Sequence, residues 1–250
     1  MRKFLKLSYN GSPFHGWQTQ PNAVSVQQTV EEALGIILRH PVPIVGAGRT
    51  DTGVHARTMY AHFDTPEELP DKQRLLTGLN RLCGPSIAIS DIIDVPDDAH
   101  ARFDATSRSY RYFVTYDKSP FLNGMSWYSP TVLDAKAMNK AASLLLRTSD
   151  FTSFAKLHSD ARTNICNVTE ATWKPWENEF GARGLVFSIT ADRFLRNMVR
   201  AVAGTLVEVG RGRLSSAGFS DIIERRDRCA AGTSMPPQAL FLWDITYPYI

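Results

Sequence analysis

The sequence predicts an α+β fold, because strand-like and helix-like segments follow one another without the regular alternation of a doubly wound sheet. Residues 107–116 (SRSYRYFVTY) alternate side chains with the period of two expected for a strand. Residues 26–37 instead space their apolar side chains as on one face of a helix. Each half of the 250-residue chain combines strands of antiparallel character with two main helices.

The N-terminal half contains signals for strands, helices and their ends. Ser25 and Gln28 have the form of a capping box, and Pro41 and Pro43 stop the helix that follows. Gly84 closes a second helix. The expected elements are strands at 3–9, from Val42, at 55–63 and at 86–95, and helices from Ser25 and at 71–82.

The C-terminal half repeats this mixture. The polar run at residues 97–100 predicts a boundary between an N-terminal domain, residues 1–105, and a C-terminal domain, residues 106–250. Gly204 inside a predicted helix indicates close packing against another backbone. The expected elements are strands at 107–116, 167–176, 185–191 and 240–247, and helices at 134–146, 193–209 and from Ser215 or Ser216 to about Arg228.

Composition excludes several classes of protein. The chain is 43% hydrophobic and 21% charged, without an apolar run long enough to span a membrane. No secretory signal is recognisable, so we expect a cytoplasmic location without a membrane partner. The three cysteines form no C-x-x-C pair. His55 and His62 are an odd number of residues apart on a predicted strand and face opposite ways, so we expect no metal site.

One carboxylate stands in a loop between two glycines, in the run Gly48-Arg49-Thr50-Asp51-Thr52-Gly53. The glycines can adopt backbone conformations that other residues resist, so the loop can approach a ligand closely. A dinucleotide-binding loop is excluded, because Asp51 occupies the third glycine position and a strand follows. From these residues alone, an ordinary turn is the more common explanation, and a catalytic carboxylate is the alternative.

Arginine is concentrated towards the end of the chain. Residues 193–228 contain eight arginines, no lysine and four acidic residues, a net charge of +4 against +3 for the whole chain. Arginine favours planar recognition of phosphate or carboxylate. Arg193, Arg196 and Arg200 share one face of the predicted helix, opposite an apolar stripe, although a solvated face is the common alternative. For residues 225–228 we expect a solvated helix face.

Two further residues could complete a site. A buried ion pair between Asp51 and Arg200 would keep the carboxylate ionised. Tyr110 could stack on a base and transfer a proton, or it could be an ordinary cross-strand aromatic residue.

The chain resembles the TruA family of tRNA pseudouridine synthases along essentially its whole length. The match begins with the loop at residues 48–56 and continues through motifs in the same order as in the family. These motifs are YNG (9–11), FHGWQ (14–18), ARF (101–103), SRSYRY (107–112), DFTSF (150–154), FLRNMVR (194–200), GTL (204–206), VG (209–210) and ALFL (239–242) with YP (247–248).

The resemblance implies roles for individual residues. Asp51 is expected to be the essential catalytic residue, with Tyr110 contacting the target base and Arg200 pairing with the aspartate. Leu240 is expected to line the pocket. Arg49 and Arg162 would help to hold and flip the nucleotide, and Arg196 would meet phosphate.

The resemblance also implies a fold and a reaction. The fold would have two similar subdomains with mainly antiparallel sheets, forming one extended sheet with the active-site cleft between them. The reaction would isomerise uridine to pseudouridine at positions 38, 39 and 40 of the tRNA anticodon stem-loop, in a homodimer, without a cofactor or metal. The alternatives are an RNA-binding or RNA-folding protein with secondary isomerase activity, and a synthase of the same fold with another target uridine.

Overall fold

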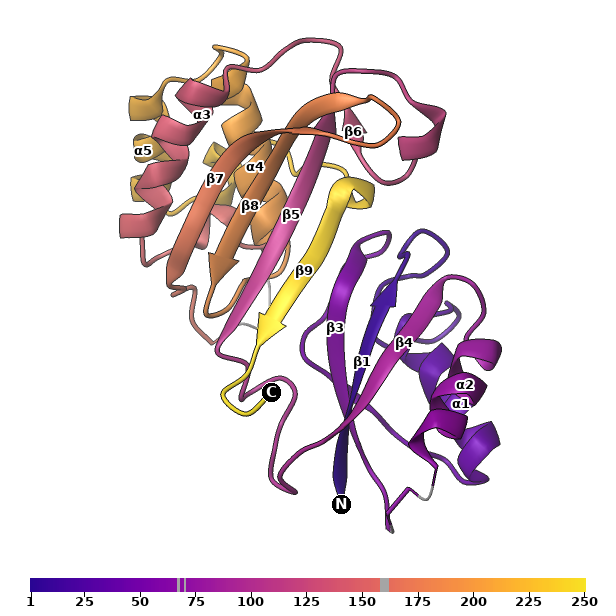
Figure 1. The fold of residues 1–250 in the computed structure, drawn as a ribbon. Coiled ribbons are helices and arrows are strands. Elements are labelled where there is room, and N and C mark those ends of the chain that lie inside the picture. Colours follow the sequence, from indigo (N-terminus) through magenta and orange to yellow (C-terminus); the bar gives the residue numbers. More distant parts are fainter. Residues whose placement is uncertain (67, 70, 158–161) are drawn as a thin grey trace. The chain divides into compact units, whose positions relative to one another are not determined.

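The computed structural model describes residues 1–66, 68, 69, 71–157 and 162–250. The chain forms two compact units (Figure 1): unit 1 comprises residues 1–106 and 241–250, and unit 2 comprises residues 107–240. The first boundary lies one residue from the predicted one. The last ten residues, expected in the C-terminal domain, group with unit 1. Each unit has the predicted α+β character.

Unit 1 has a mainly antiparallel sheet accompanied by two helices (Figure 1). The strand order is β4-β1-β3-β9, β2 pairs with β3, and only the β3–β9 pairing is parallel. The elements are β1 (Arg2–Tyr9), α1 (Val26–Leu38), β2 (Val45–Gly46), β3 (His55–Asp64), α2 (Lys72–Leu82), β4 (Ile87–Asp94) and β9 (Leu240–Thr246), which begins at the unit boundary.

Local signals fix both helices of unit 1. The N–H of Gln28 donates to Ser25 Oγ over 3.2 Å, and the N–H of Arg74 donates to Asp71 Oδ1 over 2.8 Å. These bonds satisfy N–H groups that the first turn of a helix leaves without a partner. α1 ends at Leu38, before Pro41, as predicted.

Unit 2 has an antiparallel sheet of order β7-β8-β5, with β6 parallel to β5, and a helical layer on one side of it (Figure 1). The strands are β5 (Ser107–Thr115), β6 (Trp127–Tyr128), β7 (Val168–Glu177) and β8 (Arg183–Ala191). The α-helices are α3 (Ala135–Ala142), α4 (Met198–Gly210) and α5 (Ser216–Arg225). Short 3-10 helices are η1 (Pro120–Leu122), η2 (Ser143–Arg147), η3 (Thr152–Phe154), η4 (Arg228–Ala230) and η5 (Pro237–Ala239).

No helix in the described ranges is long and apolar enough to cross a membrane.

The predicted helix at 193–209 is wrong at its start, because α4 begins only at Met198. Asn197 has a φ of 67°, and a right-handed helix cannot continue through such a residue. The Asn197 side-chain amide donates to Ser234 Oγ over 2.7 Å and so holds this conformation. Arg193 and Arg196 therefore lie in the loop before α4, and they share no helix face with Arg200.

The predicted helix from Ser215 to Arg228 also ends early, at Arg225. Arg226 has a φ of 50° and stops the helix. The guanidinium of Arg228 donates to Gly232 O over 3.2 Å and to Ser234 Oγ over 2.8 Å. Arg228 thus holds a loop, whereas a solvated helix face was expected.

The centre of unit 2 is α4, which is almost entirely buried. A Cβ atom on Gly204 would lie 1.9 Å from the carbonyl oxygen of Thr233, so the predicted close backbone contact is confirmed. The N–H of Gly232 donates to Thr205 Oγ1 over 3.0 Å, and the N–H of Met235 donates to Arg200 O over 3.0 Å. The segment 232–235 is therefore bound along the N-terminal half of α4.

Replacement of Gly204 by alanine should destabilise the protein. The new methyl group would overlap a backbone carbonyl, which should lower the free energy of unfolding by about 1–3 kcal/mol. Gly35→Ala in α1 is the matched control. A Cβ atom on this helical glycine would lie an ordinary 3.5 Å from His40 O. That change should raise stability by up to about 1 kcal/mol. Urea denaturation of both variants measures the difference, and equal effects would contradict the packing argument.

An aromatic cluster in unit 1 buries a histidine. The ring of His62 stacks on Phe4, at a centroid distance of 6.2 Å, and its Nδ1 accepts the N–H of Ala101 over 3.1 Å. The Tyr247 hydroxyl donates to Ala101 O. Burial lowers the pKa of His62 from 6.5 to about 4, and the positive charge of Arg2 adds to this effect. The folded state therefore favours the neutral imidazole.

Acid should weaken unit 1 through His62. Because the folded-state pKa is depressed, the stabilisation is complete above pH 6.5 and is lost as the pH falls towards 4, at most about 3 kcal/mol in total. His62→Asn offers an oxygen near the position of Nδ1 but does not titrate. The drop in melting temperature between pH 7 and pH 4.5 should be smaller for this variant than for the natural protein. Equal drops would refute the assignment.

Candidate active site

The residues predicted for the site fall in both units. Arg49 and Asp51 belong to unit 1, and the remaining five belong to unit 2: Tyr110, Arg162, Arg196, Arg200 and Leu240.

The loop that carries Asp51 joins β2 to β3 in unit 1. The N–H of Val54 donates to Asp51 O over 3.1 Å, which closes a tight turn after the aspartate. Gly53 has a φ of 78°, as its predicted role requires. Gly48 has no φ in the left-handed region, and an added Cβ there would meet no atom of the described chain within 4 Å. Asp51 is half-buried and Arg49 is exposed.

A second segment of unit 1, from Tyr9 to Trp17, contacts this loop. The N–H of Trp17 donates to Thr50 O over 3.3 Å, and the Tyr9 hydroxyl lies 2.9 Å from Thr50 Oγ1. Gly16 has a φ of 88°, and a Cβ there would lie 2.4 Å from the same Thr50 carbonyl. The residue preceding Asp51 is therefore held through both its main chain and its side chain.

The far end of the loop is held in the same way. A Cβ on Gly11 would lie 2.1 Å from Val54 O, and the N–H of Gly11 donates to His55 Nδ1 over 3.0 Å. The ring proton of His55 is accordingly on Nε2. The buried His55 ring also stacks on Phe241 at 4.5 Å. Sequence reasoning assigned no role to Gly11, Gly16 or His55. The pair of glycines, five residues apart before the loop, was the signal that could have indicated these close contacts.

Tyr110 lies within β5 of unit 2, paired with Ile189 of β8. The tyrosine is half-buried, and its ring meets Phe194 edge to face, with centroids 5.1 Å apart and planes at 88°. Phe194 falls within the helix predicted at residues 193–209. In the structure it lies in the loop before α4 and restricts the Tyr110 ring instead.

Arg200 is the third residue of α4, and its side chain is held by a backbone carbonyl. Nε donates to Met235 O over 2.7 Å, while Met235 N donates to Arg200 O. The reciprocal pair fixes the direction of the guanidinium fork relative to α4. Nearby, the buried Tyr112 hydroxyl donates to Pro236 O over 3.1 Å, and burial raises the pKa of this phenol.

Two exposed arginines of the predicted site lie on adjoining loops of unit 2. The carbonyl of Arg196 accepts the N–H of Lys156 over 3.1 Å. Arg193 donates to Thr163 O, the residue after Arg162, over 3.3 Å. Both Arg162 and Arg196 are exposed, as phosphate contacts require. Leu240, at the start of β9, is buried at 5% exposure.

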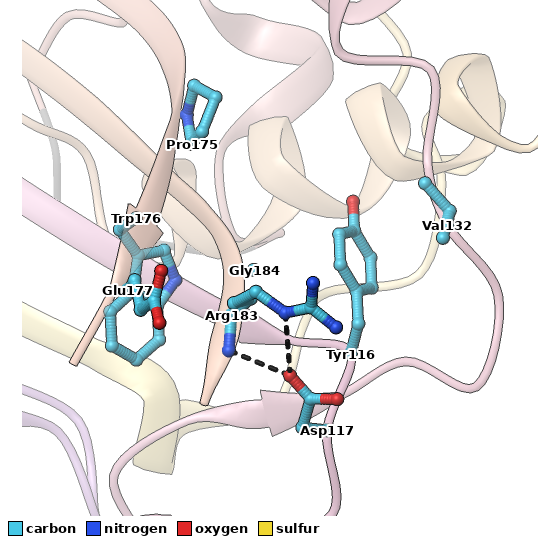
Figure 2. Close-up of a pocket in the computed structure, with 8 residues that line it drawn as sticks. All are labelled: Tyr116, Asp117, Val132, Pro175, Trp176, Glu177, Arg183 and Gly184. Carbon is cyan, nitrogen blue, oxygen red and sulfur yellow. Dashed lines mark hydrogen bonds and ion pairs between the residues drawn. The ribbon is translucent and has the colours of Figure 1, made fainter. Parts of the chain in front are cut away.

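A pocket of about 550 Å³ opens elsewhere in unit 2 (Figure 2). Figure 2 shows Arg183 facing Asp117, with the Arg183 N–H donating to Asp117 Oδ2 over 2.8 Å. None of the predicted site residues lines this pocket. Tyr116 in its wall is six residues beyond Tyr110, about 20 Å along an extended chain. The pocket is therefore separate from Tyr110.

Among the described residues, no group of three or more His, Cys, Asp or Glu side chains could hold a metal ion.

Comparison with known proteins identifies the family. A family model described as tRNA pseudouridine synthase matches residues 141–248. A tRNA pseudouridine synthase A from Parabacteroides distasonis is 56% identical over 247 residues, covering 99% of this chain and 96% of that protein. The proteins of the same name from Porphyromonas gingivalis and Bacillus subtilis are 54% and 37% identical, with coverage of 97% or more of each chain.

The matched class is that of RNA-modifying isomerases that convert uridine to pseudouridine. The chain belongs to the tRNA pseudouridine synthase A family, as the resemblance predicted.

Substitution at Gly16, which contacts the Asp51 loop, should affect the protein more than substitution at Gly48 within the loop. Gly16→Ala forces an alanine into a left-handed conformation and against Thr50 O, so both the melting temperature and turnover of tRNA should fall. Gly48→Ala meets no atom within 4 Å and should leave the melting temperature unchanged. Thermal melts and turnover assays of the two variants check this. A stable, active Gly16→Ala protein would show that the close contact between Gly16 and Thr50 is not required.

Proposed function

We propose that this enzyme isomerises uridine to pseudouridine at positions 38, 39 and 40 of the tRNA anticodon stem-loop, with Asp51 as its essential catalytic residue. The observation that carries the proposal is the double hold on the Asp51 loop. Its own turn and the segment from Gly11 to Trp17 both hold the loop through main-chain contacts. A carboxylate presented by a fixed backbone suits a reaction that needs one positioned anionic group.

The reaction exchanges one bond for another within the same nucleotide. The N1–C1′ bond of uridine breaks, the detached uracil turns, and a C5–C1′ bond forms as C5 loses its proton and N1 gains one. No electrons are lost or gained overall, so the step balances without an oxidant or reductant. The Asp51 carboxylate could attack C1′, add to C6 or remove a ribose proton.

The surroundings of the base must meet two requirements. The target uridine has to leave its stack to reach the carboxylate, which costs a few kcal/mol. Water has to be kept from the ribose while the base is detached, since hydrolysis would leave an abasic site. Bulky residues around the base serve both needs, and we assign Tyr110 and Leu240 to this role.

Tyr110 and Arg200 are assigned as the catalytic partners of Asp51. Tyr110 would stack on the uracil and act in the removal of the C5 proton, and its edge-to-face contact with Phe194 supports a fixed ring. Arg200 would pair with Asp51 and keep the carboxylate ionised. The bond from Arg200 Nε to Met235 O supports this role, because the fork is already oriented by the backbone.

The remaining arginines are assigned to the RNA backbone. Arg49 and Arg162 would help to hold and flip the nucleotide, and Arg196 would meet phosphate; all three are exposed, and exposed guanidinium groups suit phosphate contacts. We further propose that the enzyme works as a homodimer in the cytoplasm.

The decisive experiment measures tritium release from C5-labelled uridine in tRNA. Asp51→Asn keeps the shape of the side chain but removes its charge, so we expect release to be lost while tRNA binding is retained. Asp221→Asn is the matched control, since Asp221 is an exposed residue of α5. Turnover by Asp51→Asn at a rate comparable to the control would show that the catalytic assignment is wrong.

The target positions need a separate measurement. Mapping of pseudouridine in tRNA from a deletion strain should show loss at positions 38, 39 and 40. Unchanged modification there would point to another target uridine. A strain whose defect is fully corrected by the Asp51→Asn protein would instead favour an RNA-folding role.

A further inference from the structure

A β-bulge follows directly after the catalytic loop and changes the direction of one arginine. In the β1–β3 pairing, Leu7 lies opposite Met59 but Tyr9 lies opposite Ala56, so Ser8 faces two residues, Arg57 and Thr58. The extra residue shifts the alternation of side chains along β3. Ala56 therefore shares the sheet face of Met59, and Arg57 lies on the opposite face. Bulges are frequent beside active sites, where they redirect a side chain.

The side chain of this arginine lies over the ring of a tryptophan in β9. The parallel register of β3 and β9 places His55 opposite Phe241 and Ala56 opposite Leu242, which brings Arg57 beside Trp243. The Arg57 guanidinium carbon lies 4.9 Å from the centroid of the Trp243 ring. One step earlier, the buried His55 ring stacks on Phe241. Two successive cross-strand pairs, His55–Phe241 and Arg57–Trp243, thus follow the loop. The histidine of the first pair is buried, and the arginine of the second is exposed.

The charge of Arg57 is not neutralised within the described residues. It is an exposed side chain, and no carboxylate of the described chain forms an ion pair with it. Arg2 of the same sheet, in contrast, is paired with Asp64 at 2.8 Å. Contact with an aromatic face restricts a guanidinium while leaving its five N–H donors at the edge available to an anion. The arrangement is that of a preoriented anion-binding group.

We propose that Arg57 binds a backbone phosphate of tRNA beside the target nucleotide, and that Trp243 is its positioning residue. The proposal rests on the proposed function, which puts the target uridine at Asp51. β3 begins at His55, straight after the loop, and Arg57 is about 7 Å further along the strand. The RNA strand on either side of the target nucleotide carries one phosphate for each nucleotide, so it supplies an anion at this distance.

The test compares tRNA affinity at several salt concentrations, using the full chain and an unmodified tRNA transcript. Arg57→Ala should weaken binding roughly tenfold and reduce the slope of log affinity against log salt by about 0.7 to 0.9. Arg74→Ala is the control for loss of one exposed positive charge, because Arg74 lies on α2. It should change neither the slope nor the affinity measurably. Arg57→Lys should retain the slope but recover only part of the affinity, because an ammonium lacks the planar fork.

Trp243 is tested by its dependence on Arg57. Trp243→Phe keeps an aromatic face and should bind nearly as well as the natural protein, whereas Trp243→Leu should bind more weakly. In the Arg57→Ala background, Trp243→Leu should cause no further loss, because the residue acts through the arginine. Losses that add in the double variant would show that Trp243 contacts RNA by itself and would overturn its positioning role.

The outcomes separate this inference from the proposed function. A natural protein that neither binds nor isomerises tRNA overturns the proposed function. A natural protein that does both, with a salt slope for Arg57→Ala equal to that for Arg74→Ala, overturns only the phosphate contact. Melting curves for each variant confirm that the comparison is between folded proteins.

Discussion

The contact on which the site depends most is the one between two stretches of main chain, at Gly16 and Thr50. The residue before Asp51 is held by its carbonyl and by its hydroxyl, and the approach is so close that no side chain fits at position 16. Because these contacts fix the main chain before Asp51, only the two torsions of the aspartate side chain remain to set the position of its carboxylate. The loop that carries Asp51 is in this sense positioned by the segment from Gly11 to Trp17.

Main-chain atoms also position a side chain in unit 2. The Arg200 side chain is bound to a main-chain carbonyl, and that carbonyl belongs to a segment held against α4 by Gly204, Thr205 and Asn197. Tyr110 is restricted by Phe194 on one side and by its strand on the other. Hydrogen-bonded supports of this kind restrict the positions that the two side chains can adopt.

Sequence reasoning succeeded where the signal was local. The capping of α1 by Ser25, the helix that follows Asp71 and the turn at Gly53 all follow from residues a few positions apart, and a glycine inside a helical pattern indicated the close contact at Gly204. It failed at Asn197, whose left-handed conformation depends on Ser234, 37 residues away. It also grouped the last strand with the C-terminal domain, whereas residues 241–250 belong to unit 1, and the pairing of β9 with β3 is not visible in periodicity. The bulge opposite Ser8 likewise depends on a register between distant strands.

The β3–β9 pairing also has a consequence for the order in which the chain can fold during synthesis. His55, directly after the Asp51 turn, rests on Phe241, and these two residues are separated by all of unit 2. A ribosome must therefore release about 185 further residues after His55 before the Asp51 loop gains its contact from β9. Contacts of such high sequence separation form late, because a long loop has to close first. A chain that ends before β9 would lack the Phe241 ring against which His55 stacks, so the residue that follows the Asp51 turn would be without that contact.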